Sequence, residues 1–571
     1  MEKSRKKSYK IQSFTELAIA IAVVVLLNIV CTSYFFRIDL TAEKRYSLSN
    51  TSKELAKNVD ADMFFKVYLE GEFPAGFKRL SRAVKEMLDE FRVYSGNNIN
   101  YQFIDPFKDA TDKQSADIVE ELNAKGLIPT NVQIKKEDEF AQKIIIPGAI
   151  VYYKGVEYPL NFLKGQFGQG PEETINSSIE LLEYEIANVL RKATETKVKK
   201  IAIVDDNTDF MRWDIAEATA MLSEFYKVEK IKLSLEIPER LQEFAGIILA
   251  KPTQTFSDFD KFKLDQYIMH GGKVLWLIET QLAHMDSLRN TDQFVTITYP
   301  TNVEDMLFRY GVRVNQNLIQ DLQCNAIPVL SGMKSGVPQQ KLLPWPYFPV
   351  VTPYGNHPVV RGVEPVWHQF VNSIDTLTNM KVKKTILLQT SPYSRVLASP
   401  SRVDLNVSRL DLQPEIFRKG PGFFNTAVLL EGNFSSIFKY KIDATDKDAA
   451  INFKQESDFN KMIVVSDGDV IRNQFKQSTG EVFPLGYDRY TKQQFGNKKF
   501  ILNCIDYLCD ESGIINIRNK EITLRLLDKG MVKKYKNQFI AINLISPLVL
   551  VILFGIINHF IRKKRYTQKA G

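Results

Sequence analysis

The sequence contains little of what metal-binding and disulfide-rich proteins need. It has four cysteines and five histidines in 571 residues, with no CxxC pair and no Cys/His cluster. A structural zinc site and a disulfide framework are therefore not expected. Cys504 and Cys509 are five positions apart in a predicted helix, about 140° around its axis, and should not bridge. Cys31 and Cys324 each stand alone in the sequence.

The motifs of common nucleotide-binding and nucleophilic enzymes are missing as well. The pair Gly272-Lys273 has Tyr267 where the first glycine of a GxxxxGK[ST] loop should stand, so the chain is not a P-loop ATPase. No G-x-S-x-G elbow occurs. Residues 279–281, Glu-Thr-Gln, follow a predicted strand where an amidotransferase has its nucleophilic cysteine. We assign no catalytic, cofactor-binding or metal-binding residue and predict a protein that is not an enzyme.

Long apolar runs, by contrast, are present near both ends of the chain. Residues 17–36, LAIAIAVVVLLNIVCTSYFF, carry no charge and as a helix would cross the roughly 30 Å hydrocarbon core of a bilayer. The run follows basic residues, is too long for a typical signal peptide and lacks a cleavage site, which indicates an uncleaved anchor. Residues 539–561 form a second run without Asp, Glu, Lys or Arg. We therefore predict transmembrane helices over 14–36 and 539–561.

The charge distribution sets the expected topology. The formal charge is +8, but the tails 1–13 and 562–571 together hold ten Lys and Arg against one Glu, so the rest of the chain is nearly neutral. Such a domain has no electrostatic reason to bind nucleic acid, whereas basic tails suit anionic lipid headgroups. The positive-inside rule, applied to the first span, places both termini in the cytoplasm. We expect a two-pass protein of the cell inner membrane with a periplasmic bulk.

Residues 37–164 are predicted to form a first extracytoplasmic α/β domain. Ser49 or Asn50 is placed to cap a helix over Thr51–Val59. The following order, β-α-β-α-β-β, suits a small sandwich with a thioredoxin-like outline. No cysteine falls between Thr32 and Gln323, so thioredoxin redox chemistry is absent. The expected elements are strands at 63–69 and 99–104, helices at 77–94 and 113–125, and a hairpin of 144–153 with 156–162.

Residues 165–195 are predicted to be a connector helix preceded by a glycine loop. The loop, GQFGQGPEE at 165–173, allows two interpretations. It can cradle an anion at the helix N-terminus, or it can be a joint with Pro171 at the first helical position. A dinucleotide fingerprint opens a βαβ unit, whereas this loop follows a hairpin, which favours the joint.

Residues 196–515 are predicted to form a second α/β domain with a mostly parallel sheet. Strands near 200–204, 228–233, 245–250 and 273–278 alternate with helices near 213–225 and 257–269. This succession resembles a flavodoxin-like or class-I-amidotransferase-like core, and such folds bind ligands at the carboxyl ends of their strands. Residues 325–440 are rich in proline and are expected to be long loops over the sheet, either a partner face or plain connections. A terminal helix at 497–508 and a stalk at 516–538 complete the chain.

Acidic residues follow two of the predicted strands. Asp205 and Asp206 come after 200–204, and Asp467 and Asp469 come after the strand at 461–465. One hypothesis is that these four carboxylates ring a cation at the edge of the sheet, as a membrane-tethered hydrolase or amidotransferase-like enzyme would need. Ordinary turn chemistry at strand ends is the commoner explanation. The histidines His270 and His284 have no nearby nucleophile to activate and are interpreted as packing or surface residues.

Several short stretches resemble one family at residue level: RIDLT at 37–41, DQYIM at 265–269, GGKVLW at 271–276, YGVRVN at 310–315 and LPWPY at 343–347. The family is that of GldG, an auxiliary, substrate-binding-like component of ABC transporters associated with gliding motility, and the resemblance covers nearly the whole chain. It implies a separate cytoplasmic ATPase and a multi-span permease as partners, and a link to protein secretion. The alternatives to this transporter function are the membrane-tethered enzyme with an acidic metal site and a purely structural periplasmic scaffold.

Overall fold

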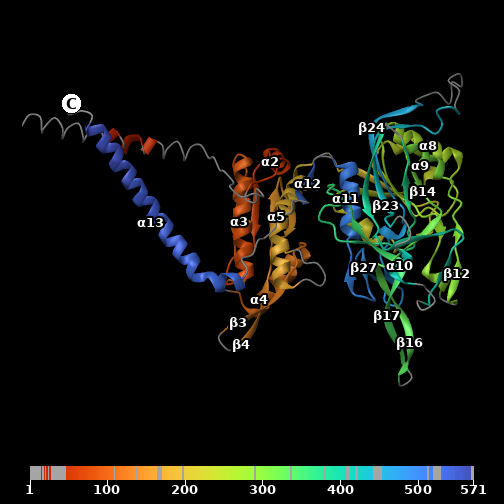
Figure 1. Cartoon of the computed structure of the whole chain (residues 1–571), viewed down its shortest axis with the longest axis horizontal. Coiled ribbons are helices and arrows are strands. Elements are labelled where there is room, and N and C mark those ends of the chain that lie inside the picture. Colours follow the sequence, from red (N-terminus) through yellow and green to blue (C-terminus); the bar gives the residue numbers. More distant parts are fainter. Residues whose placement is uncertain are drawn as a thin grey trace, which may run out of the picture. The chain divides into compact units, whose positions relative to one another are not determined.

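The computed structural model of the chain (Figure 1) describes most of its middle and its C-terminal helix. The described residues are 47–108, 110–136, 139–163, 170–195, 198–288, 291–334, 337–378, 381–406, 412–417, 422–441, 453–510, 513–518 and 529–567, with eight scattered positions between 15 and 26. Residues 1–521 form one compact unit and residues 522–571 a second. The predicted first span, 14–36, lies largely outside the described residues, and so do residues 165–169 of the predicted glycine loop at 165–173.

A four-stranded sheet forms from the first part of the chain. Its order is β2-β1-β5-β6, with β1 parallel to β2 and antiparallel to β5. Met63, Phe65 and Val67 alternate with more exposed neighbours along β1, so one face of this strand is buried. The strands are β1 Met63–Val67, β2 Ile99–Phe103, β5 Gly148–Tyr153 and β6 Val156–Asn161.

Helices bury the inner face of this sheet. Leu80, Val84, Leu88 and Phe91 recur at helical spacing along α3 and are fully buried. Helices α3 and α5 lie side by side (Figure 1). The sequence did not predict the hairpin of β3 and β4, which lies between α4 and β5. The elements are α2 Asn50–Lys57, α3 Ala75–Tyr94, α4 Asp112–Ala124, β3 Thr130–Lys136, β4 Glu139–Ile145 and α5 Pro171–Thr194.

Helix α12, Ile514–Arg518, returns to this first core from the far end of the chain. Ile514 and Ile517 are buried with the side chains of α3 and α5, whereas Ile515 belongs to the core of the larger sheet. The helix packs against both α5 and α2. The prediction of a stalk over 516–538 is therefore wrong at its start, because the apolar side chain of Ile517 is buried in a core.

A mixed twelve-stranded sheet forms the core of the rest of the unit. Its path is β16-β17-β20-β23-β24-β10-β9-β7-β8. The strands from β24 to β8 are parallel, as the sequence predicted, whereas β16, β17, β20 and β23 are antiparallel to their neighbours. The parallel strands are β7 Lys200–Val204, β8 Lys227–Ile231, β9 Phe244–Ala250, β10 Lys273–Leu277 and β24 Glu456–Val465.

The prediction of loops over 325–440 is wrong, because much of this region is strand. The proline-rich stretch LPWPYFPV lies inside β17, whose Trp345 and Tyr347 are fully buried. Prolines lack a donor for the sheet ladder, and the ribbon of β16 and β17 tolerates them with register shifts. The antiparallel strands are β16 Cys324–Lys334, β17 Val337–Pro353, β20 Val382–Gln389 and β23 Asn425–Ser435.

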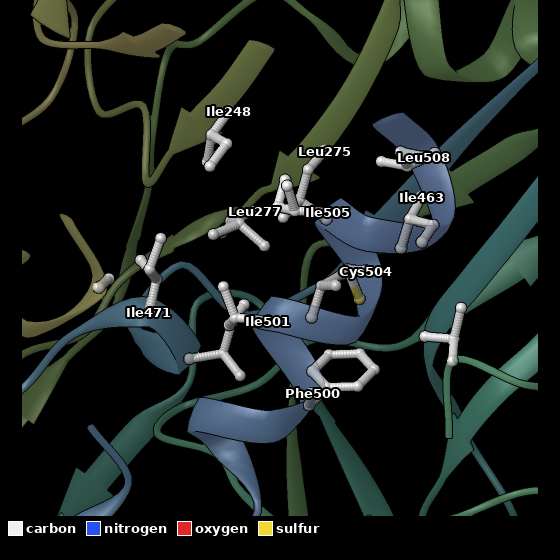
Figure 2. Close-up of a cluster of buried hydrophobic side chains, with 14 of the residues drawn as sticks. Ile248, Leu275, Leu277, Ile463, Ile471, Phe500, Ile501, Cys504, Ile505 and Leu508 are labelled. Atoms are coloured by element: carbon white, nitrogen blue, oxygen red, sulfur yellow. The ribbon is translucent and has the colours of Figure 1, made fainter. Parts of the chain in front are cut away.

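Helix α11, Asn497–Cys509, covers one face of the parallel strands. Figure 2 shows Phe500, Ile501, Cys504, Ile505 and Leu508 of this helix directed at side chains of the sheet, among them Ile248, Leu275, Leu277 and Ile463. Cys504 and Cys509 are free thiols. The helix lies so close to the sheet that a Cβ on Gly246 of β9 would stand 2.5 Å from the Cys509 sulfur, so only glycine fits there.

Shorter elements connect these layers. They are η1 Leu233–Leu235, α6 Ala216–Ser223, α7 Pro238–Leu241, α8 Asp258–Met269, β11 Gln281–Leu282, η2 Met285–Leu288, β12 Gln293–Val295, β13 Ile297–Thr298, α9 Glu304–Tyr310, β14 Val312–Val314, β15 Asn317–Asp321, β18 Val366–Trp367, β19 Ile374–Thr376, β21 Ser394–Ala398, β22 Arg402–Asp404, α10 Pro414–Phe417, η4 Asp469–Ile471, β25 Phe475–Lys476, β26 Glu481–Val482, β27 Tyr487–Asp488 and β28 Gln493–Gln494.

The second unit contains one long helix, α13, Lys529–Thr567. Its stretch Tyr535–Ile561 is long and apolar enough to cross a membrane, and none of its most apolar window is buried. The helix contains the predicted span 539–561 and adds the basic residues on both sides of it. Pro547 lies inside the helix, where it removes one backbone hydrogen bond.

A buried carboxylate on α5 holds the start of α2, and its removal is our first test. The Glu183 carboxylate accepts hydrogen bonds from the Ser49 amide (2.6 Å) and the Ser52 hydroxyl (2.7 Å). We expect Glu183→Ala to lower the free energy of unfolding by about 1.5–3 kcal/mol, because it leaves these donors unpaired. Glu172→Ala, which breaks an exposed pair with Arg79, should cost less than about 1 kcal/mol. Equal shifts in the thermal unfolding of the two variants would contradict this assignment.

Candidate functional site

The carboxyl ends of three parallel strands bring charged side chains to one edge of the large sheet. Lys251 follows β9 directly, Glu279 lies two residues beyond β10, and Asp467 and Asp469 follow β24. The last residues of these strands are in register, with Leu277 beside both Ala250 and Val465. Because open α/β folds bind ligands at this edge, we take this group as the candidate functional site.

Lys251 is the centre of the group. Its Nζ atom lies 2.6 Å from Asp469 Oδ2 and 2.8 Å from Glu279 Oε2. The three side chains are at most 3 % exposed, so both contacts are shielded from water. Lys251 adopts a positive φ of 48°, and a Cβ on Gly468 would stand 2.5 Å from the Lys251 Cβ. This turn fixes Lys251 between its two carboxylates. The close approach of the neighbouring segment leaves room only for a glycine at position 468.

Asp467 is held by a second set of buried contacts. Its Oδ2 atom accepts a hydrogen bond from His368 Nδ1 at 2.8 Å and from the Gln369 amide at 2.9 Å. Its Oδ1 atom accepts the Asp469 amide at 2.7 Å. The segment after β18 is thereby tied to the end of β24. Neither His368 nor Asp467 is exposed, so this contact is structural and closed to solvent.

Burial and charge act in opposite directions on the acids of the site. Burial raises the pKa of Glu279 well above its usual value, although Lys251 opposes this. Burial also acts against ionisation of Asp469, but the charges of Lys251 and Arg472 outweigh it and lower the pKa of Asp469 to about 2. The same carboxylates raise the pKa of Lys251 despite its burial. The group therefore contains an ionised Lys251–Asp469 pair with Glu279 as a weaker acid beside it.

The three acids have the spacing of a metal site, but the lysine takes the place of the metal. Oxygens of Glu279, Asp467 and Asp469 lie within 4.8 Å of one another. A divalent cation prefers such oxygens. However, the Lys251 ammonium already contacts two of the three carboxylates at ion-pair distance. A second cation would meet this positive charge, so the residues do not fit a metal.

The four aspartates of the cation hypothesis are not brought together. Asp206 accepts hydrogen bonds from the Leu233 and Ser234 amides at 2.8 Å and so caps η1, and Asp205 is exposed. His284 is half-buried near the site, and burial followed by the charge of Lys251 lowers its pKa. Sequence reasoning missed Lys251, Glu279 and His368. A lysine directly after the apolar strand IILA was the available signal, but its partner Asp469 is 218 positions away.

Comparison with known proteins identifies the family. The model of a family described as an ABC-type uncharacterized transport system matches residues 198–504, more than half of the chain. The chain belongs to this family. A domain of unknown function matches residues 42–152. Membership in the transport-system family makes the chain a transporter-associated accessory protein, and α13 adds the means of membrane association.

The chain is also similar to individual proteins at low sequence identity. An uncharacterized protein of Borreliella burgdorferi (strain ATCC 35210 / DSM 4680 / CIP 102532 / B31) is 19 % identical over 552 residues, which cover 93 % of this chain and 94 % of the relative. Among solved structures, the mmIFT52 N-terminal domain is 13 % identical with a TM-score of 0.31, covering 55 % of this chain and 98 % of that domain.

Substitutions at the two acids should separate their roles. We expect Asp469→Asn to lower the free energy of unfolding by about 3–5 kcal/mol, because Lys251 loses its ionised partner in a buried place. Glu279→Gln should not lower it at neutral pH and should raise it, since the amide imitates the protonated acid that burial favours and does not have to take up a proton on folding. Chemical unfolding of the full-length protein in detergent measures both. A larger loss of unfolding free energy in the Glu279 variant than in the Asp469 variant would overturn the assignment of an ionised Asp469 and a protonated Glu279.

The same groups set the pH dependence of stability. The pKa of Asp469 is lower in the folded chain than its ordinary value of 3.8. The stabilisation of the folded chain by this carboxylate is therefore present above pH 3.8 and is lost as the pH falls toward about 2. The pKa of Glu279 is raised above 4.5, so its contribution is present below that pH and is lost as pH rises. The Glu279→Gln variant should therefore lose less stability than the parent as pH rises above 4.5.

Proposed function

We propose that this protein is a membrane-anchored, non-catalytic auxiliary subunit of an ABC transporter, with its bulk in the periplasm. The match to the transport-system family over residues 198–504 is the observation that carries the proposal. A helix able to cross a bilayer supports the anchoring. The resemblance to GldG adds a link to gliding motility and protein secretion, with a separate cytoplasmic ATPase and a multi-span permease as partners.

The charges at the sheet edge support a non-catalytic role. A hydrolase or amidotransferase-like enzyme needs an exposed nucleophile or a metal with an open position. Lys251 and its carboxylates are buried and paired with each other, and His368 is committed to Asp467. The edge therefore joins strands to one another. A partner or substrate of this subunit is then bound by the exposed loops and strands.

The path of the chain supports attachment through both ends. The chain enters the smaller core at α2, close after the predicted span 14–36. It leaves that core at α12, which packs against α2 and precedes α13. Two antiparallel spans would anchor the same small domain, with residues 198–510 inserted between its elements. Both termini are then cytoplasmic, as the basic residues before the first span indicate.

Co-purification tests the transporter assignment. We expect the full-length protein, tagged after residue 571 and extracted from membranes in mild detergent, to recover one ATPase and one multi-span permease in comparable amounts. An unrelated two-span protein with the same tag is the control for detergent and resin. Recovery of the protein without transporter subunits, in several detergents, would contradict the proposal and favour a structural scaffold.

Protease accessibility tests the topology. Protease added to intact spheroplasts should digest residues between 37 and 538, because they are expected outside the cytosol. A tag after residue 571 should stay protected until the membrane is opened. A soluble cytoplasmic protein serves as the control for spheroplast integrity. If the middle of the chain survives while a known periplasmic protein is digested, the topology is wrong.

A further inference from the structure

Two exposed aromatic side chains lie beside basic residues at one place around the large sheet. Tyr440, in the turn that follows β23, is 84 % exposed, and Phe308 on α9 is 58 % exposed. Arg309 follows Phe308 on the helix, and α9 packs against β23. Exposed apolar side chains that gather at one place mark interaction sites on folded domains. The helix and the turn therefore form a candidate contact surface.

Basic side chains surround the ring of Tyr440. The Arg309 guanidinium carbon lies 5.9 Å from the ring centroid, and Lys439 Nζ lies 5.8 Å from it. Lys441 follows the tyrosine, and its Nζ lies 5.4 Å from the centroid of the Phe438 ring. Cations at these distances are attracted to the aromatic faces. We call Phe308, Arg309, Lys439, Tyr440 and Lys441 the cationic aromatic patch.

A carboxylate beside the patch is already shared by two lysines. Glu456 of β24 lies 2.8 Å from Lys439 Nζ and 3.2 Å from the Nζ of Lys381, which precedes β20. Hydrogen bonds from Lys439 and Lys381 lower the pKa of Glu456 to about 2, so this carboxylate stays ionised. Arg309 and Lys441 have no carboxylate at ion-pair distance within the described part of the chain. Four cations thus share one carboxylate.

Neighbouring acids do not cancel this excess of positive charge. Asp305 of α9 pairs with Lys261 at 2.6 Å, and Asp458 of β24 pairs with Lys454 at 2.7 Å. Glu304 begins α9, at the end of the helix away from the arginine of the patch. Because each of the two aspartates already has its own lysine, the patch keeps its positive charge and attracts an anionic partner.

The geometry of the patch favours a protein segment over a bilayer surface. Anionic lipids attract flexible basic runs that need no fixed arrangement. In the patch, by contrast, Glu456 fixes Lys439, and the ring of Tyr440 lies against Arg309. Arginine and tyrosine are enriched among the residues that contribute most to protein interfaces. Groups that are held in place before binding lose less entropy when a partner arrives.

We propose that the cationic aromatic patch is a docking site for an acidic segment of a partner protein. The segment places carboxylates against Arg309 and Lys441, and an apolar or aromatic side chain against Tyr440. The carboxylates supply the charge-assisted hydrogen bonds that these two cations lack, and the ring contact buries exposed apolar surface. The inference goes beyond the transporter assignment and does not depend on it, because the patch belongs to the large sheet alone.

Peptide binding to the full-length chain in phosphatidylcholine nanodiscs tests the proposal. The probe is a short fluorescent peptide rich in glutamate and containing phenylalanine, and its fluorescence anisotropy reports binding. We expect Arg309→Gln with Lys441→Gln to weaken binding at least tenfold, because both ion pairs are lost. The matched control is Lys230→Gln with Lys232→Gln, which removes two exposed lysines elsewhere and gives the same net charge. It should leave binding within twofold of the parent.

Substitution of Tyr440 separates docking from attraction by charge alone. Tyr440→Ala should weaken peptide binding at least fivefold, whereas Tyr440→Phe should resemble the parent because it keeps the ring. Raising sodium chloride from about 0.05 to about 0.5 M should also weaken binding to the parent, because salt screens exposed ion pairs. These side chains are exposed, so the thermal unfolding of the variants should match that of the parent.

Three results would overturn the proposal. The first is a peptide that does not bind the parent, or that loses equal affinity in both double variants. The second is equally tight binding of a peptide with lysine in place of glutamate. The third is association with phosphatidylglycerol vesicles that requires Arg309 and Lys441 while the acidic peptide does not bind, which would assign the patch to a lipid surface. Failure to co-purify an ATPase and a permease would contradict the transporter assignment and leave the peptide result unchanged.

Discussion

The buried ion pair of Lys251 and Asp469 is the interaction on which the large sheet depends. It joins the ends of β9 and β24 across β10, and Asp467 extends the connection to His368. Charges that are out of contact with water are stable only in pairs, so each group needs its partner. The edge that holds ligands in many α/β proteins is here closed by the chain's own charges. We therefore expect recognition by this family member on surfaces outside the sheet edge.

Sequence reasoning found the elements that local patterns determine. Alternating apolar strands and amphipathic helices predicted β7 to β10 and α8, and spacing predicted the free thiols of α11. It failed where distant segments decide the structure. From the sequence alone Lys251 cannot be told from a surface lysine, because its partner Asp469 lies far along the chain. The prolines of β17 indicated loops, because the tolerance of a strand for proline depends on which of its amides pair.

The C-terminal apolar helix could be predicted from the sequence for a physical reason. The ability to cross a bilayer depends on length and on the lack of charge, both of which are properties of a single stretch. Helix α13 agrees with that expectation and begins several residues earlier than the apolar run. A few polar residues determine which face of such a helix contacts another protein. These residues, like the span, can be identified from a single stretch of sequence.

The return of α12 to the smaller core has a consequence for biosynthesis. Ile514 and Ile517 complete a core whose other members come mainly from residues 48–190. During translation the ribosome has to make the whole inserted region before these two side chains exist. Because Ile515 of the same helix is buried in the core of the large sheet, both cores stay incomplete until α12 emerges, and the smaller, earlier one waits longest. Chaperone dependence would then concentrate on the part of the protein that is made first.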